Sequence, residues 1–346
     1  MAGLTWVRVA LAAVVAASLL GCASGGARDP GPVAAVAVPV AGDVGVHDPE
    51  LVVTAGAWYV FSTGEDGKGD GAPQVRRSRD QGRTWEYVGT VWDKDTRPAW
   101  AYAKVPLVSN FWAPDVIEHD GTYYLYYSAS SFGSNTSAIG LTTNTTLDPD
   151  DPGYRWVDRG EVVGSGSGDD FNTIDPGVIT AEDGVPWMAF GSFWGGVQLV
   201  ELSWPNGKPA ADAEPERIAV RDTGTNPIEA PVLVRHGSFY YLFVSRDYCC
   251  KGTGSTYQIA VGRSSTITGP YVDAVGQDLV TGGGTVLLTT HGDRIGPGGQ
   301  SYDDGYLAFH YYDGAAGGAP TLAIRSVSWT EDGWPVVRTA DELATP

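Results

Sequence analysis

Cysteine is scarce in this chain of 346 residues, which contains only Cys22, Cys249 and Cys250. No CxxC pair occurs anywhere, so the ligand pattern of a structural zinc site is missing. Cys249 and Cys250 are neighbours and cannot close a loop that would hold distant parts of the fold together. In an exported protein they either form a strained vicinal disulfide or remain as two thiols.

Basic residues are also few. The sequence has 22 Lys and Arg against 41 Asp and Glu, which gives a formal net charge of −19 at pH 7. A chain this acidic repels nucleic acids and anionic lipid surfaces, which excludes both as partners. A neutral polymer remains compatible with the charge. The simplest role of the acidic surface is to keep an exported protein soluble.

Helical periodicity is absent from the body of the chain. The composition includes 47 Gly, 22 Pro, 12 Trp and 17 Tyr, which is typical of many short strands joined by tight turns. About 300 residues follow the N-terminal segment, and this is enough for one large β-rich domain.

Long apolar runs are missing except near the N-terminus. Arg8 precedes an apolar run at residues 9–20, which is shorter than a membrane-spanning helix. The run ends in Leu-Leu-Gly followed by Cys22, and this resembles a bacterial lipobox. We therefore expect a signal peptide over residues 1–21 and a lipid on Cys22. An ordinary signal peptide that is cleaved nearby is the alternative.

Residues 22–45 are rich in Ala, Gly, Pro and Val and carry little charge, which predicts a flexible tether. The folded catalytic domain is expected over residues 46–346. The mature protein would then be exported and would touch the membrane only through a lipid anchor on Cys22, or it would be secreted. We expect it to be a monomer.

A short phrase with an acidic residue beside proline recurs along the chain. Its copies are His47-Asp48-Pro49-Glu50, Trp112-Ala113-Pro114-Asp115, Ile174-Asp175-Pro176-Gly177 and Ile228-Glu229-Ala230-Pro231. An aromatic-rich strand follows each copy after a turn glycine. These strands are expected at residues 58–62, 123–128, 187–191 and 239–245, with a fifth copy around Tyr306.

The spacing of these strands predicts the fold. Their central aromatic residues are 54 to 65 residues apart, and each interval can hold a four-stranded antiparallel sheet, the blade of a β-propeller. Five copies predict an all-β, five-bladed propeller. A two-sheet sandwich would explain alternating strands but not the long, even repeat. The strand that closes the ring is expected just after Gly45 or around residues 334–338.

Residues 78–85 match the S-x-D-x-G-x-x-W pattern of the hairpin known as an Asp-box. Asp80 is expected to accept hydrogen bonds from backbone amides of the turn, and Trp85 is expected to pack beneath it. This motif supports a propeller in general and carries no catalytic information.

Asp48, Asp175 and Glu229 are the candidate catalytic residues. A single acid beside proline is more often a turn residue that caps its own backbone. Here the acids recur at equivalent positions of the repeat, and a radial fold directs such positions toward one axis. Carboxylates crowded into a low-dielectric site cannot all ionise, so one becomes a general acid with a raised pKa and another serves as general base.

Paired carboxylates beside aromatic side chains are typical of glycoside hydrolysis. Sugar rings present apolar faces that stack on Trp and Tyr, and Trp112 and Trp194 lie in or just after an acid-bearing phrase. Most of the other aromatic residues are expected to pack between blades.

The ordered set of phrases resembles glycoside hydrolase family 43 and, within it, is most similar to the endo-1,5-α-L-arabinanases. The resemblance spans residues 45–313 and also rests on residues 191–194 (GSFW), on residues 310–313 (HYYD) and on the cysteine pair before Lys251. It implies a five-bladed propeller that hydrolyses internal bonds of arabinan with inversion. The two carboxyl groups of an inverting enzyme stand roughly 6.5–9.5 Å apart, which leaves room for a water molecule.

By this resemblance, Asp48 is the general base that activates water, and Glu229 is the general acid that protonates the departing oxygen. Asp175 sets the pKa and orientation of Glu229. Asp115 would shape the pocket through hydrogen bonds, with a simple turn residue as the alternative. Trp112 would be a stacking wall, and the residues that would line the central sugar subsite are Asn172, Thr173, Ile174, Gly191, Ser192 and Phe193.

The resemblance also gives His310 a metal-binding role, because the matching histidine helps to hold an ion, often calcium, mainly through water. Imidazole is an unusual partner for a hard cation, so water ligands would have to dominate. A structural histidine with satisfied hydrogen bonds is the alternative, and His47 either orients Asp48 or packs. No organic cofactor is expected. One departure is Gly299-Gln300, where the family commonly carries His-Asn, and it bears on the chain specificity.

Two other readings of the site remain open. An exo-acting α-L-arabinofuranosidase or β-xylosidase would use the same three acids on the same fold. A non-catalytic, lipid-anchored sugar-binding protein is the other possibility, although all three acids are present. A sialidase is disfavoured, because binding a sialic carboxylate needs an arginine cluster and no arginine accompanies the acid phrases.

Overall fold

The computed structural model describes Met1 and residues 33–344. The expected signal peptide, Cys22 and the first part of the expected tether lie outside the described residues. Within the described part of the chain, no helix is long and apolar enough to cross a membrane.

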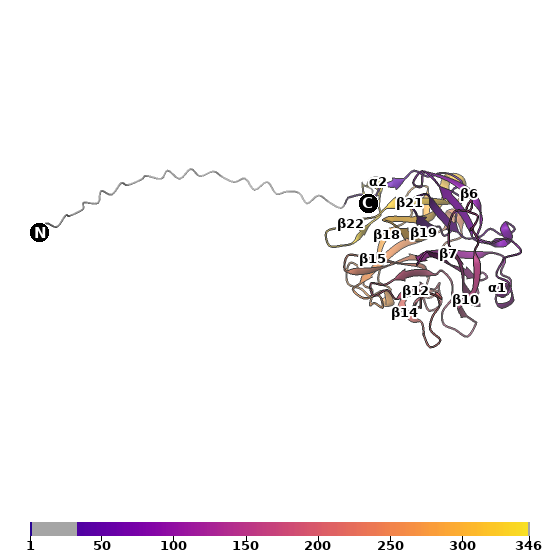
Figure 1. Cartoon of the computed structure of the whole chain (residues 1–346). Coiled ribbons are helices and arrows are strands. Elements are labelled where there is room, and N and C mark those ends of the chain that lie inside the picture. The colour runs from indigo at the N-terminus through magenta and orange to yellow at the C-terminus, as the bar shows by residue number, and fades with distance from the viewer. Residues whose placement is uncertain (2–32, 345–346) are drawn as a thin grey trace. The chain divides into compact units, whose positions relative to one another are not determined.

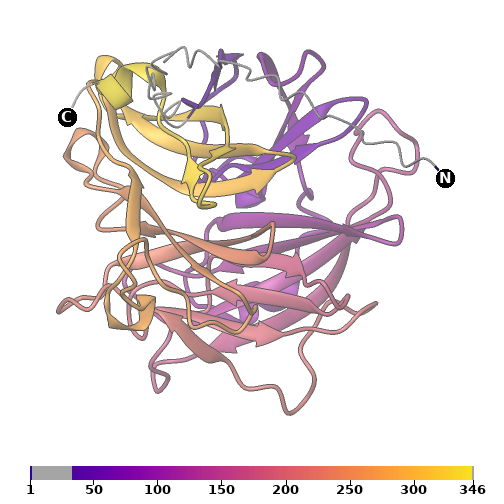
Figure 2. The ribbon, with the colours of Figure 1, turned by 90° about the vertical axis from the view of Figure 1, so that its left-hand side faces the viewer.

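Five antiparallel sheets form the blades of a β-propeller, which confirms the predicted fold (Figures 1 and 2). The innermost strands of the blades contact one another in a closed ring. The first two blades consist of β3 (Glu50–Val53), β4 (Trp58–Ser62), β5 (Gln74–Ser78) and β6 (Thr84–Thr90), and of β7 (Phe111–His119), β8 (Thr122–Ala129), β9 (Ser137–Asn144) and β10 (Val157–Ser165).

The remaining three blades follow in chain order. Blade three consists of β11 (Gly177–Thr180), β12 (Pro186–Phe190), β13 (Val197–Glu201) and β14 (Glu216–Ala219). Blade four consists of β15 (Ile228–His236), β16 (Phe239–Arg246), β17 (Gln258–Ser264) and β18 (Thr285–Leu288). Blade five consists of β19 (Arg294–Asp303), β20 (Tyr306–Asp313), β21 (Ala319–Ser326) and β1 (Ala37–Val38).

Helices are few and short, as the lack of helical periodicity predicted. The structure describes α1 (Ala99–Lys104) and α2 (Ala340–Ala344), together with four single turns of 3-10 helix. The strands β22 (Ser328–Trp329) and β23 (Pro335–Val336) form a small separate hairpin near the C-terminus.

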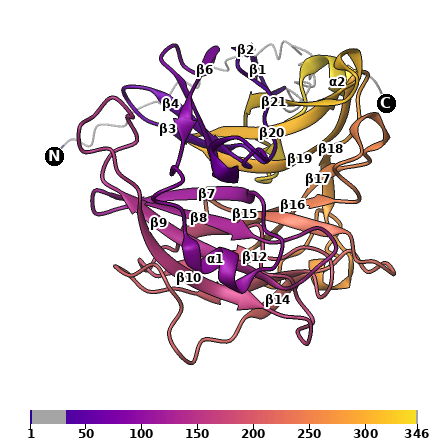
Figure 3. The same cartoon turned by 90° about the vertical axis from the view of Figure 1, so that its right-hand side faces the viewer.

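The strand that closes the ring comes from the segment expected to be a tether. β1 pairs with β21, so that Ala37 lies opposite Arg325, and Figure 3 shows the two strands side by side. β2 (Ala41–Gly42) then pairs with the outer strand β6 of blade one. Both expected positions for the closing strand, after Gly45 and at residues 334–338, are therefore wrong. The folded part begins before residue 46, because this apolar segment covers the free edge of β21.

The predicted aromatic strands are β4, β8, β12, β16 and β20, each of them the second strand of its blade. Their large side chains fill the space between blades. Phe61, Tyr127, Tyr241 and Phe309 are all at most 1 % exposed. This burial of aromatic surface is the main force that holds adjacent blades together.

One residue in or just before each innermost strand has a left-handed backbone and lines the same cavity, and these five are called the axial residues below. They are Asp48, Ala113, Asp175, Ala230 and Gly299, with φ values of 52°, 40°, 58°, 49° and 56°. All five line one small cavity between the blades. The inner strands are therefore turned toward the same space by the same local conformation.

The backbone amide of each axial residue donates a hydrogen bond to a side chain of the preceding blade. The acceptors are His310 Nδ1 for Asp48 (3.1 Å), Thr63 Oγ1 for Ala113 (2.9 Å), Ser128 Oγ for Asp175 (2.9 Å), Asp175 Oδ2 for Ala230 (3.1 Å) and Ser245 Oγ for Gly299 (2.9 Å). These five bonds link blade five to one, one to two, two to three, three to four and four to five. They satisfy amides that the bulged strand starts leave without a sheet partner.

The Asp-box forms as predicted. The Asp80 carboxylate accepts hydrogen bonds from the Thr84 amide at 2.8 Å and from the Ser78 hydroxyl at 2.7 Å. Trp85 is 2 % exposed and donates from its indole nitrogen to the carbonyl of Gly82.

The axial hydrogen bonds can be tested at Ser128, which is fully buried. Ser128→Ala leaves the amide of Asp175 without an acceptor, so we expect the free energy of unfolding to fall by about 1–3 kcal/mol. Urea denaturation measures this change. Ser109→Ala, at an exposed loop position, is the control and should stay within about 0.5 kcal/mol of the unchanged protein. Equal stability of the two variants would contradict the role given to Ser128.

Candidate active site

Asp48 lies just before β3, where two side chains of blade one hold its carboxylate. Its Oδ2 atom accepts hydrogen bonds from His47 Nδ1 at 2.8 Å and from Thr63 Oγ1 at 2.7 Å. Burial alone would raise the pKa of Asp48, but the charge and hydrogen bond of His47 lower it below the usual range. Asp48 is therefore ionised at neutral pH, which is the state that a general base requires.

Glu229 is the second residue of β15 and is 8 % exposed. Ser192 donates from Oγ to its Oε2 atom over 2.6 Å, and the Tyr257 hydroxyl donates to Oε1. Burial raises the pKa of Glu229, and the Asp48 carboxylate adds to this effect, while the two hydrogen bonds oppose it. The net shift is upward, so Glu229 keeps its proton to higher pH than an ordinary glutamate, as a general acid must.

Asp175 lies beside Glu229, because its Oδ2 atom accepts the amide hydrogen of Ala230, the residue that follows Glu229. Burial raises the pKa of Asp175 well above the usual range, and the charges of Glu229 and Asp48 raise it further. The three acids are thus close enough to change one another's ionisation. The structure brings together the three residues that the sequence selected.

The expectation that the acids occupy equivalent positions of the repeat is wrong in detail. Asp48 and Asp175 are axial residues, whereas Glu229 comes one residue before the axial residue Ala230, and Asp115 comes two residues after Ala113. The strand pairing shifts by a bulge at both of the latter places, between Glu229 and Val232 and between Trp112 and Asp115. A bulge redirects a side chain without changing the spacing of the strands.

Asp115 lines the axial cavity together with Asp48 and Asp175, but burial and the Val178 hydrogen bond, and not the charges of those acids, shift its pKa. The Asp115 Oδ2 atom accepts the amide hydrogen of Val178 at 3.1 Å. This bond links blade two to blade three in addition to the axial hydrogen bond between these blades. Burial raises the pKa of Asp115 to about 7. Glu50 makes the same kind of contact with the amide of Val116 at 3.4 Å. Asp115 therefore makes an inter-blade hydrogen bond and is not a simple turn residue.

Most of the residues expected to line the sugar subsite make no side-chain hydrogen bond to the candidate catalytic acids. Asn172 and Thr173 are 3 % and 0 % exposed, and Asn172 Oδ1 accepts a hydrogen bond from Ser137, so both lie within the loop that precedes Asp175. The Ile174 carbonyl accepts the amide hydrogen of Gly191. Only Ser192 of this set has a side-chain hydrogen bond to a candidate catalytic acid.

Two groups of aromatic side chains come from segments that adjoin the site residues. The Phe193 ring is 5.9 Å from that of Tyr248, which is 36 % exposed, and the adjacent Trp194 is 41 % exposed. The Trp112 ring is 5.6 Å from that of Phe132, which is 82 % exposed. Of the two tryptophans expected from the sequence, Trp112 thus lies beside an aromatic residue that is open to solvent, and Trp194 is itself exposed.

His310 is fully buried in β20, where its ring lies 3.8 Å from that of His47. Burial and the nearby His47 lower the pKa of His310 well below the usual range, so its ring is neutral. Because Nδ1 accepts the Asp48 amide hydrogen, the ring proton belongs on Nε2. That atom has no hydrogen-bond partner among the described residues. A neutral ring with a free N–H fits an ion that is held through water and does not fit direct ligation.

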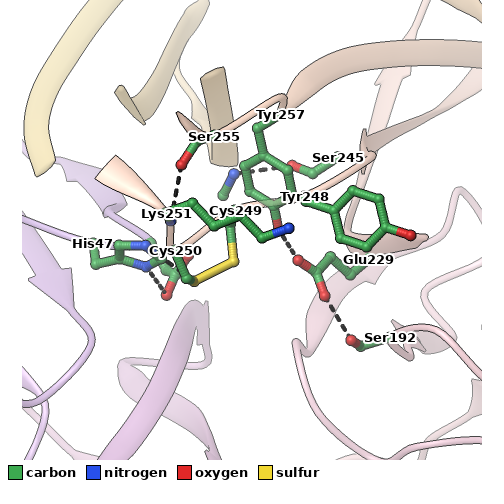
Figure 4. The surroundings of a disulfide bond; sticks show 12 residues. His47, Ser192, Glu229, Ser245, Tyr248, Cys249, Cys250, Lys251, Ser255 and Tyr257 are labelled. Atoms are coloured by element: carbon green, nitrogen blue, oxygen red, sulfur yellow. Dashed lines mark hydrogen bonds and ion pairs between the residues drawn. A yellow bond between two sulfur atoms is a disulfide. The ribbon is translucent and has the colours of Figure 1, made fainter. Parts of the chain in front are cut away.

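Cys249 and Cys250 form a disulfide, which decides between the two states that the sequence left open. Figure 4 shows this bond close to His47 on one side and to Tyr248 and Glu229 on the other. The Sγ atom of Cys250 is 3.8 Å from His47 Nε2. The cysteine pair therefore belongs to the surroundings of the candidate catalytic acids.

Comparison with known proteins identifies the family to which the chain belongs. The model of the family "Glycosyl hydrolases family 43" matches residues 39–335. The chain belongs to glycosyl hydrolase family 43.

Family 43 relatives cover most of this chain, and their names differ in how they cut. The chain is 41% identical over 309 residues to an extracellular exo-alpha-(1->5)-L-arabinofuranosidase of Cellvibrio japonicus, with 85% of this chain and 86% of that protein covered. It is also 41% identical over 295 residues to an extracellular endo-alpha-(1->5)-L-arabinanase of Bacillus subtilis, with 84% and 87% covered.

A solved structure of Cellvibrio cellulosa alpha-L-arabinanase complexed with arabinohexaose has a TM-score of 0.79 to this chain. The two share 40% sequence identity, and the match covers 87% of this chain and 97% of that chain. The similarity thus extends over essentially the whole propeller.

Five residues of this family 43 site were not selected from the sequence: Thr63, Ser128, Ser245, Tyr257 and Tyr312. Ser128 and Ser245 pair directly with Trp112 and Glu229 across their hairpins, so counting back from the turn would have found them. Tyr257 carries no such signal, because it reaches Glu229 from just before the third strand of the blade.

Proposed function

We propose that this domain hydrolyses the α-1,5-linked L-arabinofuranosidic bonds of arabinan with inversion, and that it cuts bonds inside the polymer. The observation that carries the proposal is the opposite pKa shift of two neighbouring acids, downward for Asp48 and upward for Glu229. Family membership makes the reaction a glycoside hydrolysis, and the names of the relatives direct the substrate assignment to arabinan.

In the proposed reaction, Asp48 removes a proton from a water molecule whose oxygen bonds to the anomeric carbon. The bond from that carbon to the glycosidic oxygen breaks, and Glu229 gives its proton to the departing oxygen. Asp48 ends protonated and Glu229 ends ionised, and one exchange with solvent restores both. This division of work needs one ionised and one protonated carboxyl group at the same pH.

Asp175 has the role of a positioning residue in this proposal. Its bond to the Ala230 amide fixes the backbone next to Glu229, and its charge interacts with that of Glu229. The exposed aromatic residues would bind sugar faces, with Trp112 and Phe132 as one group and Trp194 and Tyr248 as the other.

Replacement of the two acids separates their roles. Asp48→Asn should lower kcat by about 10²–10⁴-fold on linear arabinan and equally on a 4-nitrophenyl arabino-oligoside, because both reactions need an activated water. Glu229→Gln should lower kcat similarly on arabinan but much less on the aryl glycoside, since 4-nitrophenolate departs without protonation. Initial rates and the anomer formed first, observed by NMR, measure both effects.

Glu182→Gln is the matched control, since the Glu182 side chain forms an exposed ion pair with Arg235 and has no hydrogen bond to any of the three acids, so kcat should be unchanged. Circular dichroism checks that each variant is folded. Near-normal turnover of arabinan by Asp48→Asn would sink the assignment of the base.

Exo-action is the second candidate, because one of the two relatives at 41% identity is named as an exo-arabinofuranosidase. The two modes share the same chemistry, so the acids cannot distinguish them. The products released early from linear arabinan can do so. We expect a mixture of oligosaccharides, as for random internal cuts, measured by chromatography before a tenth of the bonds is broken. Release of a single short product from the start would instead assign exo-action.

We also propose that the site holds one Ca²⁺ through water beside His310, whose Nε2–H is buried and unpaired among the described residues. Such an ion would supply positive charge next to the carboxylates. After treatment with a chelator, added Ca²⁺ should raise the melting temperature by a few degrees, because a ligand of the folded state stabilises it. An unchanged melting temperature, with no bound metal by elemental analysis, would contradict this proposal.

The cell location is proposed from the N-terminal sequence and from the relatives named as extracellular. The protein is exported, and a lipid on Cys22 anchors a monomeric domain to the membrane. The mass of the mature N-terminal peptide tests this, since an unmodified N-terminus at another residue would mean secretion without an anchor.

A further inference from the structure

A chain of hydrogen bonds runs from the disulfide to the candidate general base. The amide nitrogen of Cys250 is 2.7 Å from the hydroxyl of Tyr312. The same hydroxyl is 2.7 Å from His47 Nε2, and His47 Nδ1 is 2.8 Å from Asp48 Oδ2. The chain joins blade four, blade five and the segment before blade one, which are far apart in the sequence.

A backbone N–H can only donate, so the Tyr312 oxygen accepts from Cys250. The proton between Tyr312 and His47 Nε2 has two possible positions. When His47 is neutral with its proton on Nδ1, Tyr312 donates to Nε2, and when His47 is protonated, Nε2 donates to Tyr312. In both states Nδ1 donates to Asp48. Tyr312 is 3 % exposed, so water does not readily replace its bond to His47. The orientation of the His47 ring, and through it one oxygen of Asp48, thus depends on the position of the Cys250 amide.

The position of that amide depends on the disulfide loop. Cys250 has a left-handed backbone, with φ of 66°, which is unfavourable for a residue with a side chain. The bond to Cys249 holds it in place, and the neighbouring Lys251 amide donates to Ser255 Oγ at 3.0 Å. Figure 4 shows the disulfide beside the His47 ring, with Cys250 Sγ 3.8 Å from His47 Nε2.

We propose that Tyr312 and the Cys249–Cys250 disulfide are positioning elements for the general base, so that the oxidised cysteine pair is required for full turnover. The proposal rests on the base role given to Asp48 above. It predicts that loss of the Tyr312 hydroxyl and loss of the disulfide act through the same interaction and therefore do not add.

The first experiment replaces the hydroxyl alone. Tyr312→Phe should lower kcat on linear arabinan about tenfold, which corresponds to about 1.4 kcal/mol, and should change KM less than twofold. Tyr311→Phe is the matched control on the same strand, because the Tyr311 hydroxyl makes no hydrogen bond within the described residues and should leave kcat unchanged. Melting temperatures of both variants check the fold.

The second experiment breaks the disulfide in the full-length protein. A dithiol reductant converts the sulfur–sulfur bond to two thiols and is itself oxidised to a cyclic disulfide. Alkylation and mass mapping of the peptide that holds Cys249 and Cys250 give the fraction reduced. Reduction should lower kcat of the unchanged protein about three- to tenfold, and reoxidation should restore it. The Cys249→Ser/Cys250→Ser variant should match the reduced protein.

Tyr312→Phe combined with reduction then decides between a shared and a separate effect. We expect reduction to change kcat of Tyr312→Phe less than twofold, because the bond through which the disulfide acts is already gone. Equal loss on reduction in both proteins, or normal kcat in Tyr312→Phe, would overturn the proposal. If the unchanged protein does not cleave arabinan at all, the proposed function fails instead, so the two failures are distinguishable.

Discussion

Each pair of neighbouring blades is tied at the axis by one hydrogen bond, from an amide in left-handed backbone to a side chain of the preceding blade. Left-handed backbone is unfavourable for residues other than glycine, by about 1–3 kcal/mol at constrained sites, and Ala113 and Ala230 both adopt it. The blade-linking hydrogen bond that each of them donates offsets part of this cost. The conformation turns every inner strand toward one small cavity, so the crowding of acids is a consequence of how the propeller closes.

Asp48 and Asp175 line this cavity, Glu229 precedes the axial residue Ala230, and the surroundings of each acid set the direction of its pKa shift. Asp48 has a histidine and a hydroxyl, so its pKa falls although it is buried. Glu229 has two hydroxyl donors and a charged aspartate nearby, and its pKa rises. The Asp175 carboxyl group accepts only one amide hydrogen bond, and its pKa lies well above the usual range. Neighbouring buried acids thus have pKa values shifted in opposite directions, which is the arrangement that acid–base catalysis uses.

The sequence predicted the propeller because aromatic strands repeat at even intervals, and it selected Asp48, Asp175 and Glu229 because they accompany those strands. It could not place Glu229 one residue before the axial position, since a bulge leaves no mark on the spacing. Nor could it find β1, whose two residues are strand only because β21, at the other end of the chain, needs a partner. The contacts among His47, Cys250 and Tyr312 depend on three blades being in place and have no local signal.

Blade three shows how closely fold and chemistry are joined. In the other four blades, a side chain in or just after the second strand accepts the hydrogen bond from the axial amide of the following blade. The equivalent position of blade three is Gly191, whose amide donates to the carbonyl of Ile174. A Cβ atom there would lie 2.4 Å from the carbonyl oxygen of Gly196, so no side chain can be accommodated. The amide of Ala230 bonds to Asp175 instead. Because blade three has no side chain at this position, the Asp175 carboxyl group accepts the blade-linking hydrogen bond in its place. The same carboxyl group lies next to Glu229, the proposed general acid, and the charges of the two groups interact.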